Sequence, residues 1–145
     1  MRFMVLMIPG DRKNYEAGAM PDEKLVGPMM KYNEELTKAG VLLGLDGLHP
    51  TSKGARISFA GGKKTVTDGP FTEARELIGG YWLWQVKSKE EALEWAKRCP
   101  ALDGDVLELR RVFEAADFGP DIAAKEGKIL EDIARNIEAN RKGSA

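Results

Sequence analysis

The architecture of this chain follows from Leu77-Ile78-Gly79-Gly80-Tyr81-Trp82-Leu83-Trp84-Gln85-Val86-Lys87, a stretch in which aromatic and apolar side chains fall on odd and even positions alike. Successive side chains of a strand point to opposite faces, so this stretch predicts a central strand with both faces buried. It is followed by Ser88-Lys89-Glu90-Glu91, a capping box in which Ser88 can accept a hydrogen bond from the amide of Glu91. The sequence therefore predicts a buried strand followed at once by a helix, which ends at Cys99-Pro100.

The remaining elements are predicted from hydrophobic periodicity and turn residues. Residues 3–8 form a strand that is apolar on both sides, and residues 11–14 form a polar loop. The next helix ends at Gly40 and either begins at Pro28 or has a kink there. The other predicted elements are a strand over 41–48 with glycines that suggest a bulge, a β-hairpin over 55–67 with a Gly61-Gly62 turn, a strand over 105–113 and a helix that includes Ile122 and Ile137.

Without the hairpin, the order of elements is strand, helix, strand, strand, helix, strand, which is the split βαβ arrangement of ferredoxin-like domains. The predicted fold class is α+β, with an antiparallel sheet, the inserted hairpin and an extra C-terminal helix. In the hairpin, Ile57 lies opposite Val66 and gives it an apolar face for docking. We expect one domain, with residues 1–114 as its main part and residues 115–145 as a C-terminal helical extension.

Both predicted helices lie on one face of such a sheet, yet two of its strands are apolar on both sides. A second copy of the chain would cover the open face, so we expect a homodimer. The buried face would bear Phe3 or Met4, Trp82 or Trp84, and Val106 or Val112. Alternatively, the C-terminal helix or the hairpin folds across the sheet as a lid.

Composition excludes several classes of protein. The 22 basic and 23 acidic residues leave a net charge of −1, which does not suit a general binder of nucleic acid or of an anionic membrane. The apolar run at residues 3–8 is too short for a signal-peptide core or a membrane span. Cys99 is the only cysteine, so no intrachain disulfide can form, although a bridge between two copies could. We therefore expect a cytoplasmic protein.

His49 and Asp68 are the candidate catalytic residues. His49 is the only histidine, and histidine is the ordinary side chain that titrates near neutral pH. It follows the second strand and Asp68 ends the hairpin, so both could lie at one end of the sheet. Taken singly, His49 is more often a loop or capping residue, and Asp68 a turn former.

A metal or nucleotide cofactor is not expected. There is no second histidine to complete a metal site with His49, and the glycine pairs at 61–62 and 79–80 lack the context of a phosphate-binding loop. Trp82, Trp84 and Trp95 are more often core residues than a cofactor cage, although they could line a pocket.

Several separated motifs resemble the DGPF group of the YCII-related proteins: residues 29–36, Gly47-Leu48-His49-Pro50, Thr67-Asp68-Gly69-Pro70-Phe71 and Gly79-Gly80-Tyr81-Trp82. The resemblance implies a ferredoxin-like domain assembled as a dimeric α+β barrel. Relatives in the wider superfamily include small-ring isomerases and dehydrohalogenases, some with a His-Asp pair, so it implies that His49 and Asp68 form such a pair. The chain departs from the family's usual Glu-x-Arg-Pro by having Arg111 after Arg110.

Two functions follow as hypotheses. The first is a small-molecule enzyme or ligand-binding protein whose pocket lies between the sheet and the hairpin, with His49 as a general acid/base that Asp68 orients or charges. Tyr81, Glu108 and Arg110 would contact the substrate, or the last two would pair with each other. The second is a noncatalytic regulator of an extracytoplasmic-function sigma factor, with which genes of this group are often associated. An exposed apolar patch on the C-terminal helix would favour the second.

Overall fold

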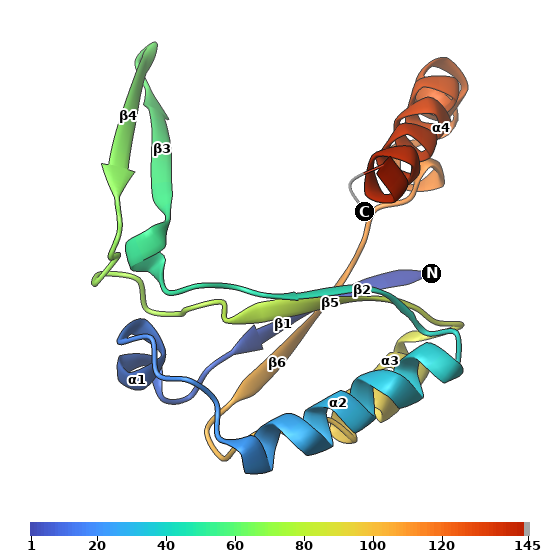
Figure 1. Cartoon of the computed structure of the whole chain (residues 1–145). Helices are drawn as coiled ribbons and strands as arrows, with labels where there is room; N and C mark the ends of the chain where they lie inside the picture. Colours follow the sequence, from blue (N-terminus) through green and yellow to red (C-terminus); the bar gives the residue numbers. More distant parts are fainter. Residues whose placement is uncertain (144–145) are drawn as a thin grey trace. The chain divides into compact units, whose positions relative to one another are not determined.

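The computed structural model describes residues 1–143, in which four antiparallel strands form the main sheet (Figure 1). The strands lie in the order β2-β5-β1-β6, which is the ferredoxin-like order for the four strands of a split βαβ unit. Their bounds are β1 (Arg2–Ile8), β2 (Leu42–Gly47), β5 (Gly80–Gln85) and β6 (Val106–Arg111). The pairing of β2 with β5 shifts register between Leu42 and Gly44, which confirms the predicted irregularity.

Helices α2 (Glu23–Lys38) and α3 (Lys89–Lys97) cover the same face of this sheet (Figure 1). The α2 helix begins ahead of Pro28, because the side chain of Asp22 accepts a hydrogen bond from the amide of Lys24 and caps the first turn. Of the two alternatives, a start at Pro28 is therefore wrong, and Pro28 lies inside the helix. The predicted cap of α3 is confirmed, since Ser88 Oγ accepts from the Glu91 amide at 3.1 Å.

A short helix, α1 (Arg12–Glu16), replaces the polar loop that we predicted there. Its N-cap is Asp11, whose carboxylate accepts hydrogen bonds from the amide and the side chain of Asn14 at 3.1 and 2.6 Å. A five-residue helix is too short to show hydrophobic periodicity, so the pattern of apolar residues gave no sign of it.

The core lies between the sheet and the helices α2 and α3. In the register of the strands, Phe3 faces Trp84 and Val5 faces Trp82, so these four side chains share one face. All four are buried in the core cluster. The expectation that a homodimer buries a face with Trp82 or Trp84 is therefore corrected, because helices of the same chain already cover both tryptophans.

The opposite face of the sheet is apolar at its centre. Met4 lies opposite Leu83, and Leu6 lies opposite Tyr81. Glu108 and Arg110 of β6 lie on this face as predicted, since they are the partners of Leu6 and Met4 in the register of β1 with β6. Residues 1–111 place no long helix on this face (Figure 1).

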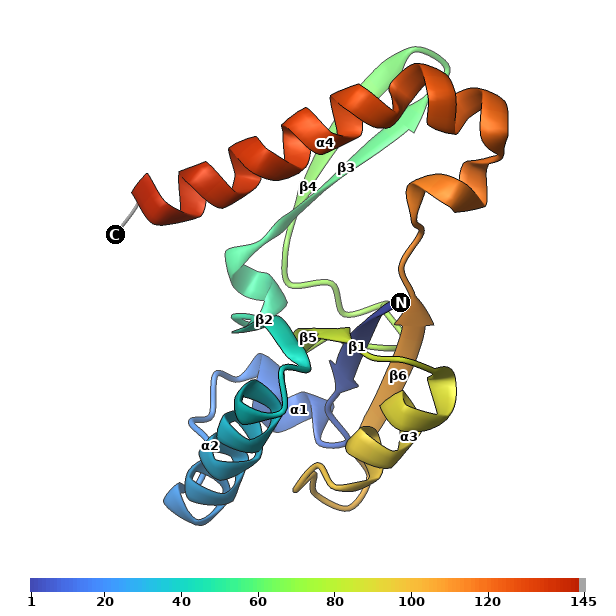
Figure 2. The ribbon, with the colours of Figure 1, turned by 90° about the vertical axis from the view of Figure 1, so that its right-hand side faces the viewer.

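The predicted hairpin consists of β3 (Ala55–Ala60) and β4 (Lys63–Asp68), with Ile57 opposite Val66 as expected. Figure 2 shows it as a long two-stranded ribbon. Every residue of both strands is exposed, including Phe59 at 72%. The docking face that we predicted is therefore present, but it is uncovered.

Residues 1–111 form one compact unit, and a second begins at Val112. The second unit contains a 3₁₀ helix (Ala115–Phe118) and α4 (Pro120–Gly143), the predicted C-terminal helix. No residue of α4 is buried. Among the described residues, no helix is both long and apolar enough to cross a membrane.

Candidate functional site

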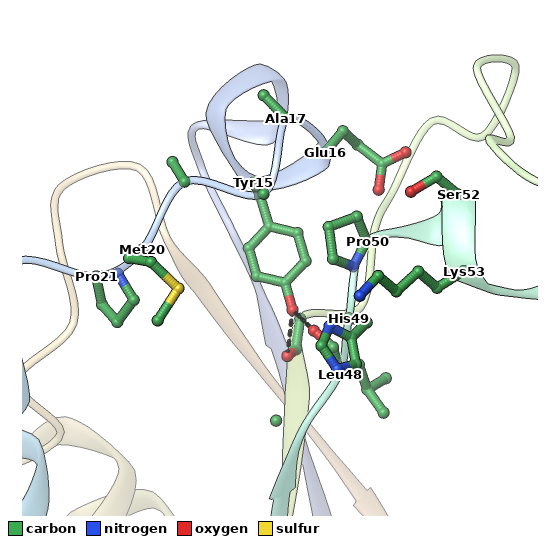
Figure 3. A pocket seen from close by; sticks show the side chains of 14 residues that line it. Tyr15, Glu16, Ala17, Met20, Pro21, Leu48, His49, Pro50, Ser52 and Lys53 are labelled. Atoms are coloured by element: carbon green, nitrogen blue, oxygen red, sulfur yellow. Dashed lines mark hydrogen bonds between the residues drawn. The ribbon is translucent and has the colours of Figure 1, made fainter.

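A cleft of about 620 Å³ lies beside α1 at one end of the sheet (Figure 3). Two segments far apart in the sequence form most of its walls, and Gly79 completes it. The first segment is residues 15–21, and the second comprises residues 47–50, 52 and 53. The volume is within the range of small-molecule sites, which is about 300–1,000 Å³.

The closeness of these segments depends on Gly79. A Cβ atom there would lie 2.9 Å from Pro9 Cγ and 3.1 Å from Tyr15 Cε2. The Tyr15 hydroxyl donates to the carbonyl of Gly79 at 2.7 Å and also bonds to that of Leu48. Burial and the nearby Glu16 charge raise the pKa of Tyr15, so its hydroxyl is neutral at pH 7. Its hydrogen bonds join helix α1 to the segments that contain Leu48 and Gly79.

Glu16 is held by Thr51 on the other wall. Its Oε1 accepts from the Thr51 amide at 3.0 Å, and its Oε2 accepts from the Thr51 hydroxyl at 2.5 Å. These bonds favour the charged carboxylate and lower the pKa of Glu16. Glu16 is therefore an ionised group with both oxygens engaged.

The same threonine fastens the loop that follows the hairpin. Thr51 Oγ1 accepts from the amide of Phe71 at 3.1 Å, and Arg12 donates to the carbonyl of Phe71 at 3.0 Å. A Cβ atom on Gly69 would lie 1.7 Å from the carbonyl oxygen of Thr51, so only glycine allows this approach. The Phe71 ring also packs under the Arg56 guanidinium at 4.0 Å.

His49 lies exposed on the wall of the cleft, whereas Asp68 ends β4 opposite Ala55 and does not line it. Their loops are joined by the contact of Thr51 with Gly69 and Phe71. Within residues 1–143, however, no hydrogen bond or ion pair joins the two side chains. The His49–Asp68 pair therefore stays a prediction.

Tyr81, Glu108 and Arg110 lie on the open sheet face rather than in the lining of this cleft. The Tyr81 hydroxyl donates to Asp46 Oδ2 at 2.6 Å. Arg110 Nη1 lies 3.5 Å from Glu108 Oε2, so these two residues pair with each other, which was one of the two alternatives. The structure does not bring these three residues together with His49.

Sequence reasoning missed four polar residues of the cleft: Tyr15, Glu16, Ser52 and Lys53. The first two are on the unpredicted helix α1, and Lys53 ends a 3₁₀ turn (Thr51–Lys53) that the repeating pattern of apolar residues does not reveal. Across the described part of the chain, no three His, Cys, Asp or Glu side chains are grouped as metal ligands.

Comparison with known proteins identifies the family of this chain. The chain is 32% identical over 76 residues to an uncharacterized protein of Rhizobium meliloti (strain 1021). That alignment covers 52% of the chain and 61% of the relative, so the chain matches less than two thirds of the relative's length. The family model of the YCII-related domain matches residues 1–116. This match covers most of the chain, which therefore belongs to the YCII-related family.

Proposed function

We propose that the chain is a small-molecule enzyme in which His49 acts as general acid and base at the cleft beside α1. The observation that carries the proposal is the position of the single histidine on the wall of a cleft of about 620 Å³. Its imidazole is exposed and has no hydrogen-bond partner within residues 1–143, so it is available to a ligand.

Acid/base chemistry fits the other groups in the cleft. Tyr15 is neutral and both Glu16 oxygens are engaged, so neither competes with His49 for a proton. An imidazole can take a proton from one carbon of a substrate and return it to another, or assist the loss of a leaving group. We therefore propose isomerase or lyase chemistry, with no metal or cofactor required.

Asp68 has a secondary role in this proposal. It would orient the imidazole or stabilise its charged form when a ligand is bound, because active-site hydrogen bonds often tighten only in the complex. The support for this role is the fastening of the loop after Asp68 to Thr51, two residues beyond His49. Asp68 is thus a positioning residue rather than a group that contacts the substrate.

Proton exchange tests the proposal without a known substrate. The protein is incubated in D₂O with mixtures of small metabolites, and mass spectrometry detects deuterium incorporated at carbon. We expect exchange into at least one compound, complete loss of exchange in His49→Gln, and a partial loss in Asp68→Asn. Lys63→Gln, at the tip of the hairpin, serves as the control and should exchange like the wild type. Exchange that persists in His49→Gln would overturn the role of His49, and no exchange into any compound would overturn the acid/base proposal.

We also propose that the chain belongs to the DGPF group and is a cytoplasmic homodimer. The group is supported by Asp68-Gly69-Pro70-Phe71, and the location by the lack of any cysteine other than Cys99. The dimer is supported by the apolar centre of the open sheet face, where Met4 lies opposite Leu83 and Leu6 opposite Tyr81. Burial of this face against a second copy would remove apolar surface from water.

Light scattering at micromolar concentration tests the dimer. The wild type should have twice the chain mass, and Leu6→Lys should be a monomer because it places a charge in the buried face. Leu102→Lys is the control, since Leu102 is 58% exposed in the loop between α3 and β6. A monomeric wild type, or a Leu6→Lys variant that stays dimeric, would contradict the proposal.

A regulatory role is a second candidate, because α4 has the exposed apolar patch that would favour it. Five apolar residues of α4 are 42–53% exposed and recur at helical spacing: Ile122, Ile129, Leu130, Ile133 and Ile137. We propose as the alternative that this stripe binds an extracytoplasmic-function sigma factor. Fluorescence anisotropy with such a purified factor should show binding that Ile133→Lys abolishes and His49→Gln leaves unchanged; no binding by the wild type would exclude this function.

A further inference from the structure

The two charged side chains of the cleft, Glu16 and Lys53, differ in whether another residue binds them. Glu16 is ionised, but Thr51 donates a hydrogen bond to each of its carboxylate oxygens. Lys53, in contrast, has no ion pair or hydrogen bond from its ammonium group within residues 1–143. The cleft therefore has one engaged anion and one cation without a partner.

Lys53 lies on the same side of the cleft as His49. In Figure 3 its side chain runs from the 3₁₀ turn toward His49 and away from Glu16. Both side chains are exposed and belong to the same wall of the cleft, and the Lys53 ammonium can donate hydrogen bonds to a ligand.

The rest of the cleft selects against other ligand classes. A cationic ligand would face the Lys53 ammonium, while the carboxylate of Glu16 is already used by Thr51. A phosphate dianion is often bound by an arginine fork or a glycine-rich loop, and the cleft supplies neither. Apolar side chains make up much of the remaining wall: Ala17, Ala19, Met20, Pro21, Leu48 and Pro50.

We propose that the ligand of this cleft is a small organic acid whose single carboxylate binds the Lys53 ammonium beside His49. This inference rests on the proposed function, since it names the substrate class for the same site. The carboxylate accepts hydrogen bonds from the Lys53 ammonium, so a ring nitrogen of His49 stays available for proton transfer, and the apolar body of the acid packs against Met20 and Pro21. Lys53 is then a substrate-binding residue that fixes the orientation of the acid relative to His49.

Benzoate and benzamide test the charge requirement, because they have nearly the same shape and differ in charge. Each is titrated into ¹⁵N-labelled protein, and the amide signals of residues 47–53 report binding. We expect benzoate to bind at least about tenfold more tightly than benzamide, which corresponds to about 1.4 kcal/mol. Lys53→Gln should remove this preference, Lys53→Arg should retain it, and Lys63→Gln should leave it unchanged.

The outcomes separate this inference from the proposed function. Equal binding of the two probes, or a preference that survives in Lys53→Gln, would overturn the carboxylate site. If deuterium exchange that depends on His49 is still observed, the acid/base proposal stands. If neither probe shifts the signals of residues 47–53, the inference is likewise overturned, and the exchange assay decides on the proposed function by itself.

Discussion

Two neighbouring tryptophans on the buried face of the sheet differ in one respect that mutation can measure. Trp82 donates its indole N–H to Asn33 Oδ1 at 2.8 Å. The indole N–H of Trp84 is buried and has no hydrogen-bond partner among the described residues. Because an unsatisfied buried donor is unfavourable, Trp84→Phe and Trp82→Phe should have different effects on the free energy of unfolding.

The expected magnitudes follow from adding the contributions. Either substitution removes buried ring atoms and leaves a small cavity, which costs about 1–2 kcal/mol. In Trp84→Phe, removal of the unsatisfied donor restores about 1–3 kcal/mol, so the net change should be close to zero. In Trp82→Phe, loss of the bond to Asn33 adds about 1 kcal/mol, for a total destabilisation of about 2–3 kcal/mol.

Urea unfolding followed by far-UV circular dichroism measures the difference. We expect Trp82→Phe to be less stable than Trp84→Phe by about 2 kcal/mol, which corresponds to a difference in Tm of about 4–8 °C for a chain of this size. Each variant is the control for the other, since both replace a core tryptophan of β5 by phenylalanine. A Trp84→Phe variant that is destabilised as much as Trp82→Phe would refute the reasoning.

Three further predictions concern the cleft and the core. Gly69→Ala should lower the free energy of unfolding by about 3 kcal/mol or more, because its Cβ would lie 1.7 Å from the carbonyl oxygen of Thr51. Gly54→Ala is the control: its Cβ would lie 3.6 Å from the same oxygen, so it should lower the free energy of unfolding by less than about 1 kcal/mol. Equal urea midpoints for the two variants would contradict this prediction. The pKa of Glu16 is lower in the folded state than its ordinary value of 4.5, so the unfolded chain binds more protons as the pH falls. The stability that Glu16 contributes is therefore present above pH 4.5 and is lost as the pH falls through the folded-state pKa. Stability measured from pH 7 to pH 3 should therefore fall less steeply in Glu16→Gln than in the wild type, and parallel curves would count against the Thr51 bonds. Burial, and to a smaller extent the charge of Asp105, raises the pKa of Cys99 from 9.0 to about 11. A thiol reagent at pH 8 should therefore react about 100-fold more slowly with the folded chain than with the urea-unfolded chain. Similar rates would show that the thiol is accessible in the folded chain.

Much of the fold could be predicted because several elements have strong local signals. The Ser88 cap and the Gly61-Gly62 turn both depend on neighbouring residues alone, and both were confirmed, although Glu91 Oε2 accepts from the amide of Lys87 rather than that of Ser88. The face of the sheet that receives the helices could not be predicted in the same way. Both faces of β1 and β5 are apolar, so alternation does not distinguish the side of Trp82 from the side of Leu83.

The candidate site was predictable only in part. His49 stands out because it is the one histidine of the chain, and it does line the cleft. The opposite wall comes from a segment more than 25 residues away, and the two meet through the bonds of Tyr15 and Glu16 to backbone atoms and to Thr51. Such contacts depend on tertiary packing, which leaves no periodic pattern in either segment.

The contacts of the Asp68-Gly69-Pro70-Phe71 motif have a consequence for how relatives are classified. Gly69 and Phe71 serve to seat a loop against Thr51, and neither lines the cleft beside His49. A gene that had lost the chemistry would therefore still be under selection to retain them, because its product must fold. The Gly69 and Phe71 positions of the motif therefore group chains by shared architecture, whereas a division by the proposed activity would have to compare the positions of His49, Lys53 and Asp68.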